Sequence, residues 1–184
     1  MKRILFFIVG SLTFSFTGFQ GCMERTDSAN GSKDDNRISK LAAFDSLEHY
    51  SIDIDLFKIG ELEDKNNKSE KEQLLLSVLS DNQVNISLLS HLKEIGYASN
   101  LVDKSLYRPI DSLFFLKVRK DNVESSCIHE FRDILVFYKN KQCIGVAKIC
   151  FDCKTMVSWS EKLNFAGFGD WGDYDKLHPL LRKN

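Results

Sequence analysis

ILVFYKNKQCIGVAKI, residues 134–149, is the stretch that decides the fold of this chain. It contains two runs rich in β-branched and aromatic residues, and a short polar break around Asn140 separates them. Asparagine tolerates the positive φ that a tight turn needs, so the pattern predicts a β-hairpin over about residues 131–151. The C-terminal half of the chain is therefore expected to build a sheet around this hairpin.

The segments around the hairpin predict helices and further strands. Ser69 and Glu72 have the spacing of a capping box, and leucines follow them at helical intervals. Gly96 is suited to end a second helix in the left-handed conformation. We expect helices over about 38–50, 70–80, 86–95 and 174–181, strands over 51–56, 113–118 and part of 155–165, and an irregular segment over 101–111. Since helices and strands do not alternate regularly, the predicted fold class is α+β, with a small antiparallel sheet packed against two or three helices.

The cysteines cluster at the hairpin. Four of the five fall within 27 residues, namely Cys127, Cys143, Cys150 and Cys153. If Asn140 is the centre of a three-residue loop, Cys127 lies directly opposite Cys153, at a spacing close to what a disulfide requires. A two-residue loop instead places Cys127 opposite Lys154. Because disulfides persist in exported proteins, we predict a structural Cys127–Cys153 bridge, with Cys150 close to it.

Two other interpretations of this cluster stay open. Cys127, His129, Cys150 and Cys153 supply a Cys₃His ligand set of the kind that holds zinc, the single cofactor that the sequence leaves open. Alternatively, the thiols are free and buried, as cysteines often are in protein cores. The CxxC of Cys150 and Cys153 is expected to continue a strand, where residues three apart face opposite sides. That geometry disfavours thioredoxin-like chemistry.

The cysteine-rich segment resembles part of a group of short lipoproteins from Bacteroidota. In those proteins a cysteine precedes an apolar strand ending in Phe-Tyr, and a turn leads to a strand ending Ile-Cys-Phe-x-Cys. Ile149-Cys150-Phe151-Asp152-Cys153 matches that ending, and Phe57-Lys58-Ile59-Gly60 is also similar. Where such proteins often have glycine in the turn, this chain has Asn140-Lys141. The resemblance implies the fold and the cellular address, and it implies no activity.

The first 22 residues have the layout of a bacterial secretory signal. Lys2 and Arg3 precede an apolar stretch of 16 residues, 4–19. A membrane-spanning helix needs about 20 predominantly apolar residues, so this stretch is typical of a cleaved signal. Gly21-Cys22 resembles the lipoprotein cleavage motif, which implies cleavage before Cys22 and acylation of that residue.

Three parts of the chain follow from these patterns. We expect a lipoprotein signal peptide over 1–21, a disordered tether over 22–37 and a single α+β domain over 38–184. The tether is polar and rich in Gly, Ser, Asn and Asp, so it cannot bury enough apolar surface to fold. Loss of residues 1–21 removes two cations and no acids, which moves the formal charge from −1 to −3. A charge so near zero does not favour nucleic acid as a partner.

No known catalytic motif is present in the sequence. GxSxG, P-loop and HExxH patterns are missing, and the GxGxxG spacing from Gly167 to Gly172 has no βαβ pattern around it. We therefore expect no catalytic residues. We predict an exported, non-enzymatic lipoprotein that is anchored in the bilayer of the outer membrane through acylated Cys22. We expect it to bind a protein of the envelope, and an immunity or inhibitor protein is one kind of protein that would do so. The alternative is metal- or thiol-dependent activity at the cysteine cluster.

Overall fold

The predicted hairpin forms the centre of the molecule. The computed structural model describes residues 43–117, 120 and 127–182. Within them, β3 (Asp133–Lys139) and β4 (Gln142–Cys150) are the inner strands of a five-stranded antiparallel sheet. The order is β2-β1-β3-β4-β5, in which β1 is Ser46–Ser51, β2 is Ala98–Leu101 and β5 is Thr155–Ser160. The predicted α+β fold class is confirmed.

The register of the hairpin differs from the expected one. The turn has two residues, Asn140 with φ 51° and Lys141 with φ 65°, so both central residues are left-handed. This is the geometry that matches the twist of two antiparallel strands. Tyr138 pairs with Cys143, but an irregularity follows, and Phe137 pairs with Gly145. The three-residue loop centred on Asn140 is therefore wrong, because Lys141 also adopts a positive φ.

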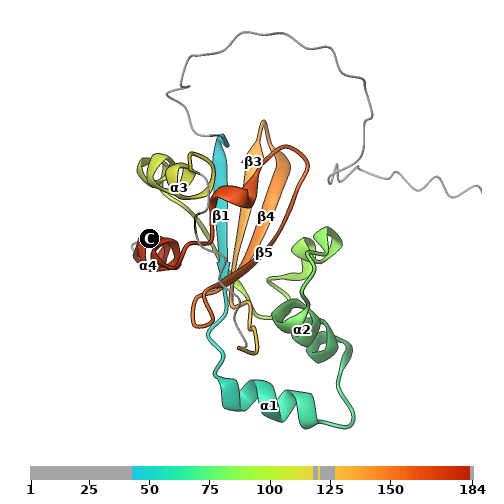
Figure 1. Cartoon of the computed structure of the whole chain (residues 1–184). Helices are drawn as coiled ribbons and strands as arrows, with labels where there is room; N and C mark the ends of the chain where they lie inside the picture. The colour runs from blue at the N-terminus through green and yellow to red at the C-terminus, as the bar shows by residue number, and fades with distance from the viewer. Residues whose placement is uncertain (1–42, 118–119, 121–126, 183–184) are drawn as a thin grey trace, which may run out of the picture.

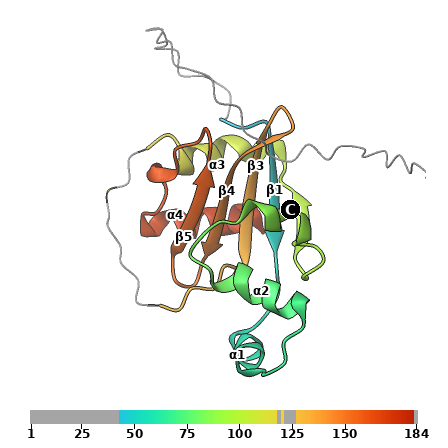
Figure 2. The same cartoon turned by 90° about the vertical axis from the view of Figure 1, so that its right-hand side faces the viewer.

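Helices cover both faces of the sheet, as Figures 1 and 2 show. On one face lie α2 (Glu70–Ser80) and the 3₁₀ helix η1 (Ile86–His91). On the other lie α3 (Tyr107–Phe114), which follows the short η2 (Lys104–Leu106), and α4 (Trp171–Leu181), which follows η3 (Phe165–Gly167). Successive residues of a strand face opposite sides, so β3 contributes to two cores. Ile134 and Val136 pack under α2, while Leu135 and Phe137 pack under α3 and α4.

Several local predictions are confirmed. Helix α2 starts where the capping box predicts, with Ser69 Oγ accepting from Glu72 N and Glu72 accepting from Ser69 N. Strand β5 and helix α4 occupy the expected segments, although α4 begins three residues earlier. The helix expected over 86–95 is the shorter η1, and Gly96 has the positive φ expected of it, 113°.

Other local predictions are wrong. Residues 38–42 lie outside the described residues, and the remainder of the expected 38–50 helix contains β1. Of the strand expected over 51–56, Ser51 ends β1 and residues 52–55 form a connection. The connection ends there because Asp55 Oδ1 accepts from Lys58 N at 2.7 Å and starts helix α1 (Leu56–Asp64). Of the strand expected over 113–118, residues 113 and 114 end α3, residues 115–117 form a turn, and residue 118 lies outside the described residues. Pro109 lies in the first turn of α3, where its missing N–H costs no hydrogen bond.

Helix α1 projects beyond the end of the sheet that lies away from the β3–β4 turn (Figure 1). The signal peptide over 1–21, Cys22 and the tether over 22–37 lie outside the described residues. In the part of the chain that the structure describes, no helix has the length and apolar character needed to cross a membrane.

Candidate functional site

Three sulfur atoms lie together where β4 leads into β5. Cys127 and Cys153 form a disulfide, with their Cα atoms 5.7 Å apart. The chain turns through residues 151–154, and Lys154 takes a positive φ of 50°. The expectation that the CxxC continues a strand is therefore wrong, because this turn places Cys150 at the end of β4 and Cys153 beyond it. Within the turn, Cys153 N donates to Cys150 Sγ at 3.4 Å.

The bridge forms outside the ladder of the hairpin. Strand β3 begins at Asp133, so Cys127 belongs to the segment that leads into it. That segment runs beside the β4–β5 turn, and Cys153 Sγ lies 3.1 Å from the carbonyl oxygen of Ile128. The register that motivated the Cys127–Cys153 pairing is wrong, yet the pair is joined, because the turn brings Cys153 back toward the incoming chain.

The fourth member of the expected zinc set makes a different contact. His129 Nδ1 lies 3.1 Å from Thr155 Oγ1. Among the described residues, no three His, Cys, Asp or Glu side chains are grouped so that they could hold a metal ion. A sulfur in a disulfide is not a thiolate, so zinc binding through Cys127 and Cys153 would require reduction of the bridge first. Cys143, also buried, lies near the opposite end of β4 from Cys150.

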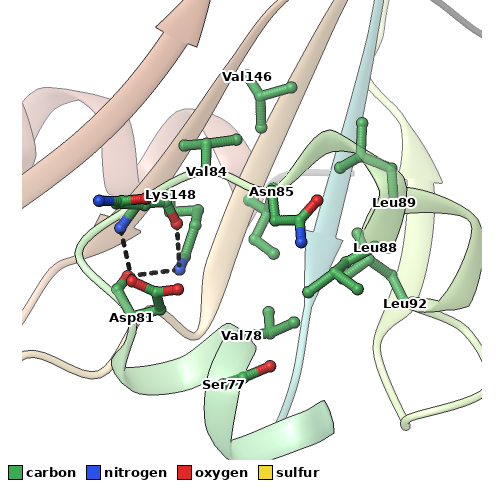
Figure 3. Close-up of a pocket in the computed structure, with 12 residues that line it drawn as sticks. Ser77, Val78, Asp81, Val84, Asn85, Leu88, Leu89, Leu92, Val146 and Lys148 are labelled. Atoms are coloured by element: carbon green, nitrogen blue, oxygen red, sulfur yellow. Dashed lines mark hydrogen bonds between the residues drawn. The ribbon is translucent and has the colours of Figure 1, made fainter.

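A buried lysine lies beneath α2, on the face of β4 (Figure 3). Lys148 is 5% exposed, and its Nζ donates to the carbonyl oxygens of Asp81 at 2.7 Å and of Gln83 at 3.3 Å. The same nitrogen is 4.7 Å from the centroid of the Phe131 ring. Burial lowers the pKa of Lys148 to about 8, and the nearby Asp81 carboxylate partly opposes that shift.

The position of Lys148 explains its burial. Both carbonyls follow the end of α2, where a helix attracts cations. The lysine therefore fixes the end of α2 to the centre of the sheet. The adjoining cavity, lined by Val78, Leu92 and Ile134 among others, measures about 20 Å³, which is space for about one water molecule. This pocket is accordingly a packing site.

The end of the sheet near α1 carries exposed apolar side chains. Leu56 and Phe57 at the start of α1 are 63% and 77% exposed, and Ile128 is 84% exposed. We call these three residues the α1 surface. They share one end of the sheet because Arg132, which follows Ile128 closely, accepts at its carbonyl from Ile52 N and donates from Nη1 to Ile54 O.

Acidic side chains border the α1 surface. Residues 52–64 contain five acids, Asp53, Asp55, Glu61, Glu63 and Asp64, and a single base, Lys58. All five acids are exposed. Phe57, Glu61 and Asp64 follow one another at intervals of four and three residues, which places them on one side of the helix. The surface thus combines an exposed aromatic ring with negative charge.

Reasoning from sequence missed both the α1 surface and Lys148. The alternation over 51–56 predicted a strand, although an aspartate before an apolar pair is also typical of a helix start, as Asp55 proves to be. Lys148 is the single charge within the apolar run 144–149, a signal that could have indicated a buried cation.

Comparison of the chain with family models, with curated proteins and with solved structures gives no match.

Proposed function

We propose that this chain is a non-enzymatic envelope lipoprotein that binds a protein partner through the α1 surface. The observation that carries the proposal is the exposure of Phe57, on a helix in which Ile59 is the buried residue. Exposed aromatic and aliphatic side chains gathered at one place typically mark an interaction site. Burial of such side chains supplies about 25 cal/mol for each Å² of apolar area removed from water.

The acids around Phe57 define the kind of partner. We infer a protein with an apolar pocket for the Phe57 ring and a basic rim that faces Glu61 and Asp64. Opposite charges at the rim would speed the encounter and select the partner, while the aromatic ring would supply much of the affinity. An immunity or inhibitor role is one form of such binding.

The proposed location in the outer membrane is based on the signal-peptide pattern of the first 22 residues and on Gly21-Cys22. Acyl chains on Cys22 would hold the protein in the bilayer of the outer membrane, and residues 22–37 would separate the domain from the lipid. Two or more chains make such anchoring persistent, because each buried methylene adds about 0.8 kcal/mol. Mass spectrometry of the purified membrane form is expected to find Cys22 as an acylated N-terminus. A different mature N-terminus, or an unmodified Cys22, would refute the lipoprotein assignment.

A pull-down from solubilised cell envelope tests the binding proposal. The bait variants are wild type, the Leu56→Ser/Phe57→Ser double variant, and Leu101→Ser as a matched control. Leu101 is 66% exposed on β2 and lies outside the α1 surface. We expect wild type and the control to retain one partner at a constant ratio, and the double variant to lose it. Equal recovery by all three baits would rule out the α1 surface as the binding site.

A further inference from the structure

Cys150 is a buried thiol placed directly beside a disulfide. It takes no part in the Cys127–Cys153 bridge, and its Sγ accepts a hydrogen bond from Cys153 N at 3.4 Å. Both Cys150 and Cys153 are buried against Phe131, and Val157 packs against the same cluster. Cys127, in contrast, is exposed. Cys153 thus contacts both of the other cysteines: it is bonded to the exposed Cys127, and its N–H donates to the buried Cys150.

We propose that these three cysteines form a thiol–disulfide exchange site, in which the bridge moves from Cys127–Cys153 to Cys150–Cys153. A thiol must lose its proton before it attacks a disulfide, and the Cys153 N–H donates to Cys150 Sγ, which holds that sulfur beside Cys153. The turn over 151–154 brings Cys150 and Cys153 close together, whereas in a straight strand residues three apart would point to opposite faces.

The step is balanced without an external oxidant or reductant. The Cys150 thiol releases its proton to water, and the thiolate attacks Cys153 Sγ. A Cys150–Cys153 bond forms as the Cys127–Cys153 bond breaks, and the electron pair of the broken bond leaves on Cys127 Sγ. The exposed Cys127 thiolate then takes a proton from solvent. One disulfide and one thiol are present before and after the step.

The substrate class follows from the position of the released thiol. Cys127 is exposed and precedes Ile128, whose side chain is also exposed, so its thiolate can attack a low-molecular-weight disulfide in solution. That attack forms a mixed disulfide on Cys127 and releases one equivalent of small thiol. Cys150, enclosed by Phe131 and Cys153, acts inside the protein and does not meet the external disulfide.

Tryptic mapping without reduction distinguishes the states. Trypsin is expected to place Cys150 and Cys153 in the peptide 149–154 and Cys127 in the peptide 121–132. The full chain is incubated at pH 8 with cystamine, a small disulfide that has no thiol, and is then acidified, alkylated and digested. We expect an internal disulfide in 149–154 and a cysteamine adduct on Cys127. Because cystamine cannot open a disulfide by itself, the Cys127 adduct should fall at least about tenfold in Cys150→Ser.

The control is Cys143→Ser, which alters a buried cysteine near the opposite end of β4 and should leave the yield of adduct unchanged. Three results would overturn the proposal, and the first two need only the wild type. One is a map in which 121–132 stays linked to 149–154 and Cys150 is alkylated. The second is a cysteamine adduct on Cys150 with the original bridge intact. The third is an equal yield of Cys127 adduct in wild type and Cys150→Ser.

Discussion

Replacement of Lys148 by methionine should remove a specific part of the pH dependence of stability. Methionine has a similar length and fills the space beneath α2, but it has no charge to bury. In the wild type, the pKa of Lys148 falls from an ordinary value of 10.5 to about 8 because burial disfavours its ammonium form. In the unfolded chain the same side chain is solvated and keeps its ordinary proton affinity.

The sign follows from which state holds the proton. Between pH 8 and pH 10.5 the unfolded state keeps the Lys148 proton and the folded state loses it, so this group makes the protein more stable as pH rises. Below pH 8 both states are protonated, and the cost of burying the charge is fully present. The difference between the two pKa values corresponds to about 3 kcal/mol. We expect a measured change of about 2 kcal/mol, since partial screening by solvent reduces the effect of the charge.

Urea unfolding at pH 7.5, 8.5, 9.5 and 10 would measure this effect in wild type and Lys148→Met. Other lysines and tyrosines titrate in the same range, so the informative quantity is the difference between the two proteins at each pH. That difference should shift in favour of wild type as pH rises. Lys176→Met, at an exposed position of α4, is the matched control and should follow wild type. A constant difference between wild type and Lys148→Met across this range would refute the assignment of a buried charge.

Three further substitutions test other parts of the fold by thermal or urea unfolding. Cys127→Ser opens a loop that spans a sequence separation of 26 residues, and should cost about 3.5 kcal/mol; a loss below about 1 kcal/mol would deny the bridge a structural role. Ser69→Ala removes the hydroxyl that caps α2 and should cost about 1 kcal/mol, whereas an unchanged midpoint would show that Glu72 suffices. Gly167→Ala places a Cβ against backbone carbonyls, one of them 2.6 Å away, and should cost about 2 kcal/mol or more; wild-type stability would contradict this packing.

Elements that depend on a local signal in the sequence were the easiest to predict. The turn at Asn140 and the capping box at Ser69 and Glu72 each specify an element through neighbouring residues alone, and both elements form. Strand β1 has no such signal. It is an inner strand, so Leu47 and Tyr50 are both buried although they face opposite cores, and their spacing imitates a helix.

The sites depended on tertiary contacts and were less predictable. Register arithmetic suggested the Cys127–Cys153 pair, but the pair forms through a turn and an incoming segment that no periodicity describes. The exposure of Phe57 follows from the direction in which α1 leaves the sheet, and that direction is set after Asp55 starts the helix. An apolar side chain that finds no partner in the fold cannot be distinguished, in sequence, from one that does.

Site-specific photo-crosslinking in intact cells tests the binding proposal most directly. Phe57 is replaced by the photoreactive aromatic amino acid p-benzoylphenylalanine, and the same replacement at Lys141, in the turn at the opposite end of the sheet, is the control (Figure 1). We predict one discrete crosslinked product with another protein at position 57 and none at position 141. Irradiation that yields no product at position 57, or the same products at both positions, would contradict the proposal that the α1 surface binds a protein partner.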